Sequence, residues 1–205
     1  MGYGLWAMDV LEYSMEVGAM GKPATRIKLT YEDYRNAPES ERERYELFEG
    51  ELVMVPPPSE YHQRISGNLG FILRGFVKKH GLGSVYYAPL DVILSDDTVL
   101  QPDILFIGKE QADIIAEEGI RGAPDLVIEI LSEATAKRDR TYKRALYARY
   151  GVKEYWLVDP ATKTVEVLEL QEQGFSRVAR YACKEKAPLK SPLLAGLSID
   201  LEKVF

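Results

Sequence analysis

Two short apolar runs constrain the fold of this chain more than any other feature of its sequence. They are residues 126–131 (LVIEIL) and 155–158 (YWLV), and neither alternates in the way of a strand with one solvated face. Near-continuous apolar runs of this length are typical of central strands covered on both faces. A helix-like segment over residues 138–150, ended by Gly151, separates them. The sequence therefore predicts an α/β fold with a mixed central sheet flanked by helices.

The remaining patterns predict one more long helix and additional β-hairpins. The helix is expected to be capped by Ser59, to run to about Lys79 and to end at Gly81. Its apolar positions share one helical face, and they are Ile65, Leu69, Ile72 and Phe76. Hairpins are expected over residues 45–55, 84–108 and 164–183, with a turn at Glu49–Gly50 in the first. A short helix over residues 109–119 and an irregular tail complete the expected order.

Length and composition favour one domain. The chain has 205 residues, of which 46% are hydrophobic and 28% charged, so it can bury a core and remain in solution. We expect a single domain over residues 27–205, preceded by an N-terminal extension over residues 1–26. Because that extension lacks a basic start and carries three acidic residues, we do not expect it to be a signal peptide.

Cysteine content and hydropathy bear on the compartment. The single cysteine, Cys183, excludes an intrachain disulfide and a cysteine-based zinc site. No apolar stretch reaches the roughly 18 residues that a membrane span needs. We therefore expect no membrane association, and a reducing cytoplasm is the simplest compartment.

Charge is distributed unevenly along the chain. The net charge of −6 does not favour a protein that coats nucleic acid, because such proteins are usually basic. Residues 133–155 nevertheless hold seven basic and three acidic side chains, whereas residues 39–51 hold six glutamates and two arginines. A local basic face can bind phosphates on an acidic protein. The alternative is an ordinary solvated helix face.

Two carboxylates interrupt segments that should be buried strands. Asp103 opens the strand-like segment DILFI, and Glu129 lies inside LVIEIL. A lone buried carboxylate costs several kcal/mol unless it is neutralised, paired or bound to a metal. A divalent cation with oxygen ligands would satisfy both residues at once. The alternative for each is a salt bridge with an arginine at a strand end.

The helix-like segment after Glu129 supplies Asp139 and Lys143, which are four residues apart and so share a face. One interpretation is an exposed helix salt bridge of about 0.3–0.5 kcal/mol. The other places Lys143 over the two carboxylates, where its ammonium could act on a water molecule or a phosphate.

These motifs resemble a known family. PDILFI (residues 102–107) followed by DLVIEILS (residues 125–132) is similar to the core of PD-(D/E)XK nucleases. Together with YELFEGELV, His62, QPD, Asp139, Lys143, Tyr147 and GVKEYWLVDP, the segment from about residue 27 to 170 resembles the Uma family of restriction-endonuclease-like proteins.

The resemblance implies a restriction-endonuclease-like fold and a metal-dependent DNA endonuclease. Asp103 and Glu129 would hold Mg²⁺ or Mn²⁺, together with the carbonyl of Ile130. The lysine of the superfamily motif is missing, because its position is Leu131, and Lys143 would replace it with Asp139 orienting it. A homodimer is also implied.

Three further residues match the family pattern and have two interpretations each. His62 is either a supporting site residue or a packing or capping residue of the first helix turn. Glu46 and Glu51 flank the first hairpin turn, where most glutamates are simply solvated. Tyr155 and Trp156 are expected in the core, not in a base-stacking platform.

Two other functions compete with the nuclease. The displaced lysine and the acidic net charge favour a nucleic-acid-binding or regulatory module that cleaves weakly or not at all. A metal-dependent phosphoesterase of small nucleotides is the third interpretation.

Overall fold

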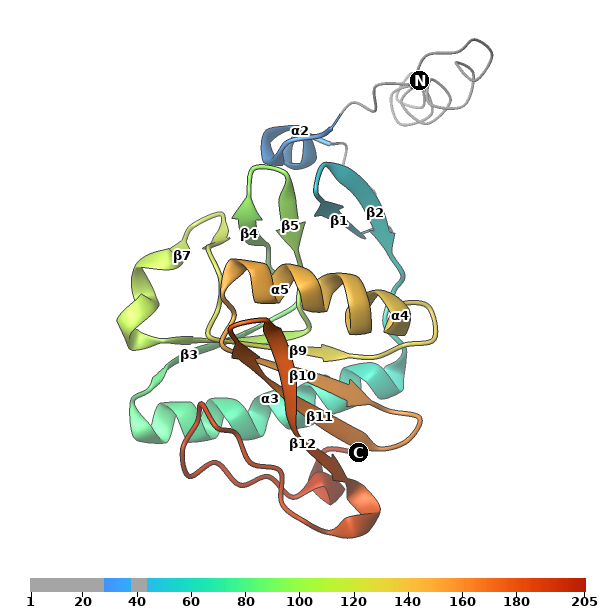
Figure 1. Cartoon of the computed structure of the whole chain (residues 1–205), viewed down its shortest axis with the longest axis vertical. Helices are drawn as coiled ribbons and strands as arrows, with labels where there is room; N and C mark the ends of the chain where they lie inside the picture. The colour runs from blue at the N-terminus through green and yellow to red at the C-terminus, as the bar shows by residue number, and fades with distance from the viewer. Residues whose placement is uncertain (1–27, 38–43) are drawn as a thin grey trace.

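The computed structural model describes residues 28–37 and 44–205 and contains two six-stranded mixed sheets flanked by helices (Figure 1). The predicted extension over residues 1–26 lies outside the described residues. None of the described helices is long and apolar enough to cross a membrane.

The second sheet is the predicted central one, with strand order β12-β11-β10-β9-β6-β3. Its strands are β3 (Gly83–Tyr87), β6 (Ile104–Gly108), β9 (Leu126–Ile130), β10 (Glu154–Asp159), β11 (Thr164–Gln171) and β12 (Gly174–Ala182). All five residues of β9 are buried. β9 pairs in parallel with β10 and antiparallel with β6, as a mixed sheet requires. The two apolar runs are therefore central strands, as predicted.

The predicted hairpins build a separate sheet, with strand order β2-β1-β5-β4-β8-β7. Its strands are β1 (Arg44–Phe48), β2 (Glu51–Val55), β4 (Val92–Ser95), β5 (Thr98–Leu100), β7 (Ile115–Ala116) and β8 (Gly119–Arg121). The first hairpin turns at Glu49–Gly50, where both residues have positive φ (48° and 87°), as a two-residue hairpin turn prefers.

The prediction of one hairpin over residues 84–108 is wrong in its extent. Only β4 and β5 form that hairpin, while β3 and β6, on either side, pair with each other in the other sheet. The breaks coincide with prolines, at Ala88–Pro89 before β4 and at Pro102 before β6. Because proline cannot donate a ladder hydrogen bond, the chain leaves one sheet there and joins the other.

Helices cover the two faces of the central sheet. α3 (Glu60–His80) is capped by Ser59 and ends at Gly81 with φ 61°, as predicted. It packs on the face formed by the even-numbered residues of β9, together with the C-terminal tail. The residues it buries most fully are Ile65, Leu69, Leu73 and Val77, whereas the predicted Ile72 and Phe76 are only partly buried. The tail has little regular structure beyond the short 3-10 helices η3 (Cys183–Glu185) and η4 (Leu201–Lys203).

The opposite face of the central sheet carries a second helical segment, drawn in yellow-orange in Figure 1. It runs through α4 (Ala136–Arg138), a π-helical turn η2 (Asp139–Lys143) and α5 (Arg144–Tyr150), and it ends at Gly151 with φ 89°. The predicted helix is therefore present with a wider turn inside it. π-helical turns are rare in proteins, and those that occur often lie at functional sites. The expected helix over residues 109–119 is a 3-10 helix, η1 (Lys109–Ile114), followed by β7.

Candidate active site

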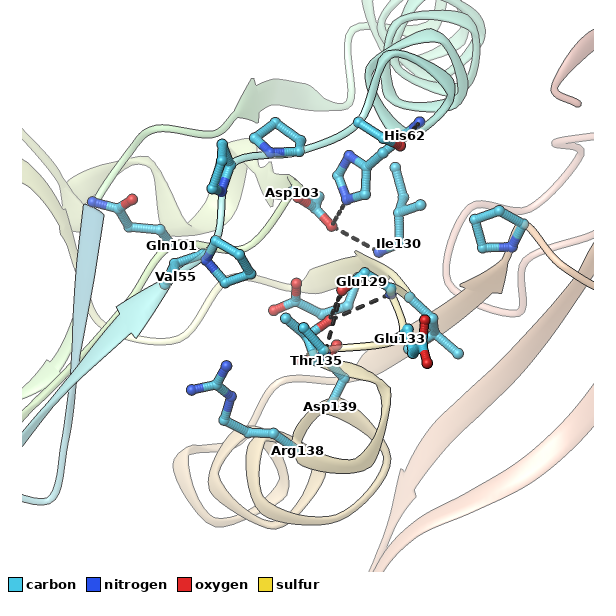
Figure 2. A pocket seen from close by; sticks show the side chains of 18 of the residues that line it. Val55, His62, Gln101, Asp103, Glu129, Ile130, Glu133, Thr135, Arg138 and Asp139 are labelled. Atoms are coloured by element: carbon cyan, nitrogen blue, oxygen red, sulfur yellow. Dashed lines mark hydrogen bonds and ion pairs between the residues drawn. The ribbon is translucent and has the colours of Figure 1, made fainter. Parts of the chain in front are cut away.

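One cavity of about 400 Å³ lies where the ends of β6 and β9 meet β1, the start of α3 and the π-helical turn (Figure 2). Side chains from both sheets line it, so it exists only because the two sheets meet. Three consecutive prolines, Pro56 to Pro58, form part of its wall.

The register of the central sheet places the two predicted carboxylates together. In the antiparallel pair of β6 and β9, Ile104 is opposite Ile128 and Leu105 is opposite Val127. Asp103 directly precedes β6, and one further step in this register would set it opposite Glu129. Directly opposed residues share a face of the sheet, with Cβ atoms about 4.5–5.5 Å apart. Both residues line the cavity.

Glu129 is buried, and its partners come from the facing helix. Its Oε1 accepts hydrogen bonds from Lys143 Nζ (3.0 Å) and from the Tyr147 hydroxyl (2.8 Å). Burial raises the pKa of Glu129 well above its usual value, and Lys143 only partly offsets this. Burial and the nearby Glu129 also raise the pKa of Tyr147, so that its hydroxyl stays protonated and donates. Glu129 therefore has partners within the protein, and they are a lysine and a tyrosine instead of the arginine considered as the alternative to a metal.

Lys143 occupies the predicted position, and its ammonium lies among three carboxylates. Nζ donates to Glu46 Oε1 at 2.8 Å and to Glu129 Oε1 at 3.0 Å, and it lies 3.9 Å from Asp139 Oδ1. Burial alone would lower the pKa of Lys143, but these carboxylates outweigh burial and raise it. Lys143 and Asp139 are only 5% and 2% exposed, so the alternative of an exposed helix salt bridge is wrong.

Asp103 lines the cavity on the side of His62, away from Lys143. Its Oδ2 accepts the backbone N–H of Ile130 at 2.7 Å and lies 3.2 Å from His62 Nε2 (Figure 2). Burial opposes protonation of His62, but Asp103 outweighs burial and raises the pKa of the imidazole. The backbone N–H of His62 also binds Ser59 Oγ at 3.2 Å. His62 is therefore part of the helix cap through its backbone and of the cavity through its ring.

The two glutamates of the first hairpin differ in position. Glu46 is 1% exposed and binds both Lys143 and the backbone N–H of Gln101 (2.8 Å), so the expectation that it is merely solvated is wrong. Glu51 is exposed and does not line the cavity. Tyr155 and Trp156 are fully buried in the core, as predicted.

Unsatisfied polar atoms mark this cavity. Within the described residues, five side chains have a buried polar atom with no hydrogen-bond partner, and all five belong to the lining: Tyr61, His62, Gln101, Arg138 and Asp139. An unsatisfied buried polar atom costs about 1–3 kcal/mol. Their concentration at one place indicates a site arranged for a ligand and not for stability alone.

Sequence patterns alone do not single out three of the residues that line or support this site. Tyr147 belongs to the family pattern, and the only signal of its role is that it follows Lys143 by four residues and so shares its face of the helix. Gln101 and Arg138 carry no local signal, because their role depends on how the two sheets meet.

The charges and donor atoms of the cavity fit a hard cation. Five carboxylates line it, from Glu46, Asp103, Glu129, Glu133 and Asp139, against four basic side chains, from Arg44, His62, Arg138 and Lys143. Within the described part of the chain, no three His, Cys, Asp or Glu side chains converge as a complete metal site. A Mg²⁺ ion does not need such a site, because it usually binds one or two carboxylates together with waters and substrate phosphates.

Comparisons with known proteins bear on the family and the fold of the chain. The model of the family Uma2, described as "Putative restriction endonuclease", matches residues 31–202. Two uncharacterized proteins of Synechocystis, slr1290 and sll1609, are 26% and 25% identical, over 87% and 70% of this chain and 92% and 81% of their own lengths. The crystal structure of a "putative nuclease belonging to DUF820" from Anabaena variabilis shares the fold. Its TM-score is 0.72 and its identity 23%, over 86% of this chain and 97% of that one.

Proposed function

Because the chain belongs to the Uma2 family of restriction-endonuclease-like proteins, we propose that it is a divalent-metal-dependent phosphodiester hydrolase that cleaves DNA. Asp103 and Glu129 would hold Mg²⁺ or Mn²⁺. When bound, such an ion polarises a phosphate oxygen and lowers the pKa of its bound water.

One observation carries the metal proposal. Asp103 and Glu129 each commit a single carboxylate oxygen to protein contacts, Oδ2 and Oε1 respectively. Within the described residues, no hydrogen bond or ion pair reaches the other oxygen of either group. Glu129 lies in β9 and Asp103 directly precedes the adjacent strand β6, and residues carried by a sheet are held rigidly. The N–H and C=O of one strand residue point the same way. The carbonyl of Ile130 would therefore also lie on the side of Asp103.

The other residues would act on the substrate through charge and position. The Lys143 ammonium would stabilise negative charge as it builds on the phosphate in the transition state, and such electrostatic stabilisation often contributes more to catalysis than any other effect. Glu46 makes a shorter contact with Lys143 than Asp139 does, so Glu46 would be the main residue that orients it. Tyr147 would fix the Glu129 side chain by its hydrogen bond.

The test is cleavage of plasmid and linear DNA in Mg²⁺ and in Mn²⁺. We expect cleavage by the wild type and its loss in Glu129→Gln, because glutamine keeps the size of glutamate but removes the anion that binds the cation. Glu172→Gln, an exposed glutamate in the turn between β11 and β12, is the matched control and should cleave normally. Cleavage by Glu129→Gln at the wild-type rate would refute the assignment.

A second candidate function is a nucleic-acid-binding module without hydrolysis. The observation in its favour is that Lys143 and Tyr147 already satisfy one oxygen of Glu129 inside the protein. DNA binding without cleavage of DNA or RNA in either metal would favour this module over the hydrolase.

A further inference from the structure

Arg138 is a cation in the cavity that the proposed hydrolysis does not use. It lines the cavity, and its Nε is buried without a hydrogen-bond partner. Within residues 28–37 and 44–205, no hydrogen bond or ion pair engages its guanidinium. Two arginines of the same helical segment are both paired: Arg140 binds Glu166 at 2.6 Å and Arg149 binds Glu49 at 2.7 Å. Arg144 of this segment also lacks an anion, but its guanidinium donates to the carbonyl of Phe175, whereas the buried Nε of Arg138 has no hydrogen-bond partner among the described residues.

Its side chain is nevertheless held in place. Arg138 ends α4, directly before Asp139, and its guanidinium carbon lies 5.5 Å from the centroid of the Phe48 ring. Phe48 is itself only 3% exposed, so the ring is a fixed surface. In Figure 2 the guanidinium extends toward Val55, away from Glu133. An arginine stacked in this way keeps its forked N–H groups available at little further entropic cost.

The carboxylates of the cavity do not provide the missing partner. Within the described residues, no ion pair joins Arg138 to any of the five, Glu133 and Asp139 included; Glu46 and Glu129 bind Lys143, and Asp103 lies against His62. Because a guanidinium cannot be a metal ligand, a bound cation would not satisfy Arg138 either. Among the described residues no anion completes it, and an anionic group of a substrate bound beside the carboxylates proposed to hold the metal would do so. Arginine is over-represented where planar, two-point recognition of phosphate is needed.

We propose that Arg138 binds a phosphate oxygen of the nucleic-acid backbone and so positions it over Asp103 and Glu129. This inference rests on the proposed function, since it names the substrate contact of the same site. Arg44, which also lines the cavity, is a second cation near that position. Arginine–phosphate contacts fix register and orientation but carry no sequence information. The cavity is therefore expected to engage DNA of any sequence equally.

The test is the binding of fluorescently labelled DNA by anisotropy, with Ca²⁺ in place of Mg²⁺, over a range of salt concentrations. Arg138→Gln should weaken binding about tenfold or more, by the same factor for unrelated sequences, as expected for a hydrogen bond to a charged group. Losing one phosphate contact should also reduce the slope of log K against log salt by about 0.7–0.9. Arg138→Lys keeps the charge, so its slope should stay at the wild-type value while its affinity falls.

Lys137→Gln is the matched control. Lys137 is the preceding residue, exposed and outside the cavity lining, and its loss removes the same charge. We expect its affinity and slope to equal those of the wild type. An equal loss in both variants would show general attraction and overturn the inference. The melting temperature of each variant is measured alongside. If Arg138→Gln does not fold, the affinity and the salt slope of Arg138→Lys test the inference instead.

Failure of this inference and failure of the proposed function give different results. If the wild type cleaves DNA and Arg138→Gln binds and cleaves equally well, only the role of Arg138 is refuted. If the wild type binds through Arg138 but never cleaves, the phosphate contact stands and the hydrolase is refuted. If the wild type binds neither DNA nor RNA, both proposals fail.

Discussion

At the scale of single residues, Lys143 decides the electrostatics of the site. It is the cation that contacts Glu46 and Glu129 directly, and all three residues are at most 5% exposed. Breaking a buried ion pair by removing one partner usually costs about 3–5 kcal/mol, because the remaining charge stays buried. Here two carboxylates would lose their partner together.

We therefore predict that Lys143→Met abolishes cleavage and lowers the free energy of unfolding at neutral pH by about 3–5 kcal/mol. Urea unfolding followed by circular dichroism measures the second effect. Lys143→Arg keeps the charge and should recover part of the stability. A Lys143→Met protein as stable as the wild type would mean that the carboxylates take up protons at little cost, and the account of Lys143 as their counter-charge would be wrong.

Some site residues were predictable from the sequence and others were not, for a physical reason. Asp103 and Glu129 were predictable because a carboxylate in an apolar strand violates a local pattern. Glu46 violates none, since a glutamate beside a hairpin turn is ordinary, and its burial arises only where β1 meets the helix that carries Lys143. Arg138 shows no such signal either. Residues whose role depends on contacts between distant segments leave no trace in local periodicity.

At the scale of elements, the breaks in regular structure position the site. The π-helical turn holds both Asp139 and Lys143 toward the cavity, and the Tyr155 hydroxyl donates to the carbonyl of Asp139 at 3.1 Å. Sequence periodicity predicts the helix and its end at the glycine. It does not predict the π-helical turn, which rotates the side chains after it relative to those before it while the sequence still reads as one helix. The prolines that divide the expected second hairpin were visible in the sequence, but which sheet each strand joins depends on tertiary pairing.

The same helical segment is tied to the hairpin of β11 and β12 through Glu166. Its carboxylate accepts from Arg140 at 2.6 Å and from Arg177 at 3.1 Å. Burial alone would raise the pKa of Glu166, but the two arginines outweigh burial and lower it below its ordinary value of 4.5. The folded state thus favours the ionised form. This stability is fully present above pH 4.5 and is lost as the pH falls through the lowered pKa.

We predict that Glu166→Gln lowers the free energy of unfolding at neutral pH by about 1 kcal/mol or less, because the partners are partly exposed. The difference from the wild type should shrink as the pH falls well below 4.5. Urea unfolding at neutral and acid pH measures it, with Glu172→Gln as a control that should show no such trend. A difference that grows toward acid pH would contradict the direction of the shift.

At the scale of the whole molecule, the candidate site lies where two sheets meet, and neither sheet contains it alone. Glu46 belongs to the hairpin sheet. Glu129 belongs to the central sheet, and Asp103 directly precedes β6 of that sheet. The α/β class, the flanking helices and the family were predictable from the sequence, because they follow from local patterns and motifs. The meeting of the two sheets was not. A single domain over residues 27–205, a homodimer and a cytoplasmic location stay predictions.

The proposed metal should also act on the stability of the whole molecule. A ligand that binds only the folded state adds about 2.7 kcal/mol at a concentration of one hundred times its Kd. For a chain of this size, each kcal/mol raises the melting temperature by about 2–4 °C. We therefore predict that Mg²⁺ or Mn²⁺ raises the melting temperature of the wild type in calorimetry.

Asp103→Asn and Glu129→Gln should each lose most of this rise, because each removes one of the two anions proposed as ligands. Glu51→Gln, in the first hairpin but outside the cavity, should keep it. Two ligand variants are needed, since Glu129 also binds Lys143 and Tyr147 and its loss alone could disturb the fold. If the metal raises the melting temperature of the wild type and of all three variants equally, the ion binds elsewhere. The uncommitted oxygens of Asp103 and Glu129 would then need a different partner, and substrate binding without metal would become the stronger account of the cavity.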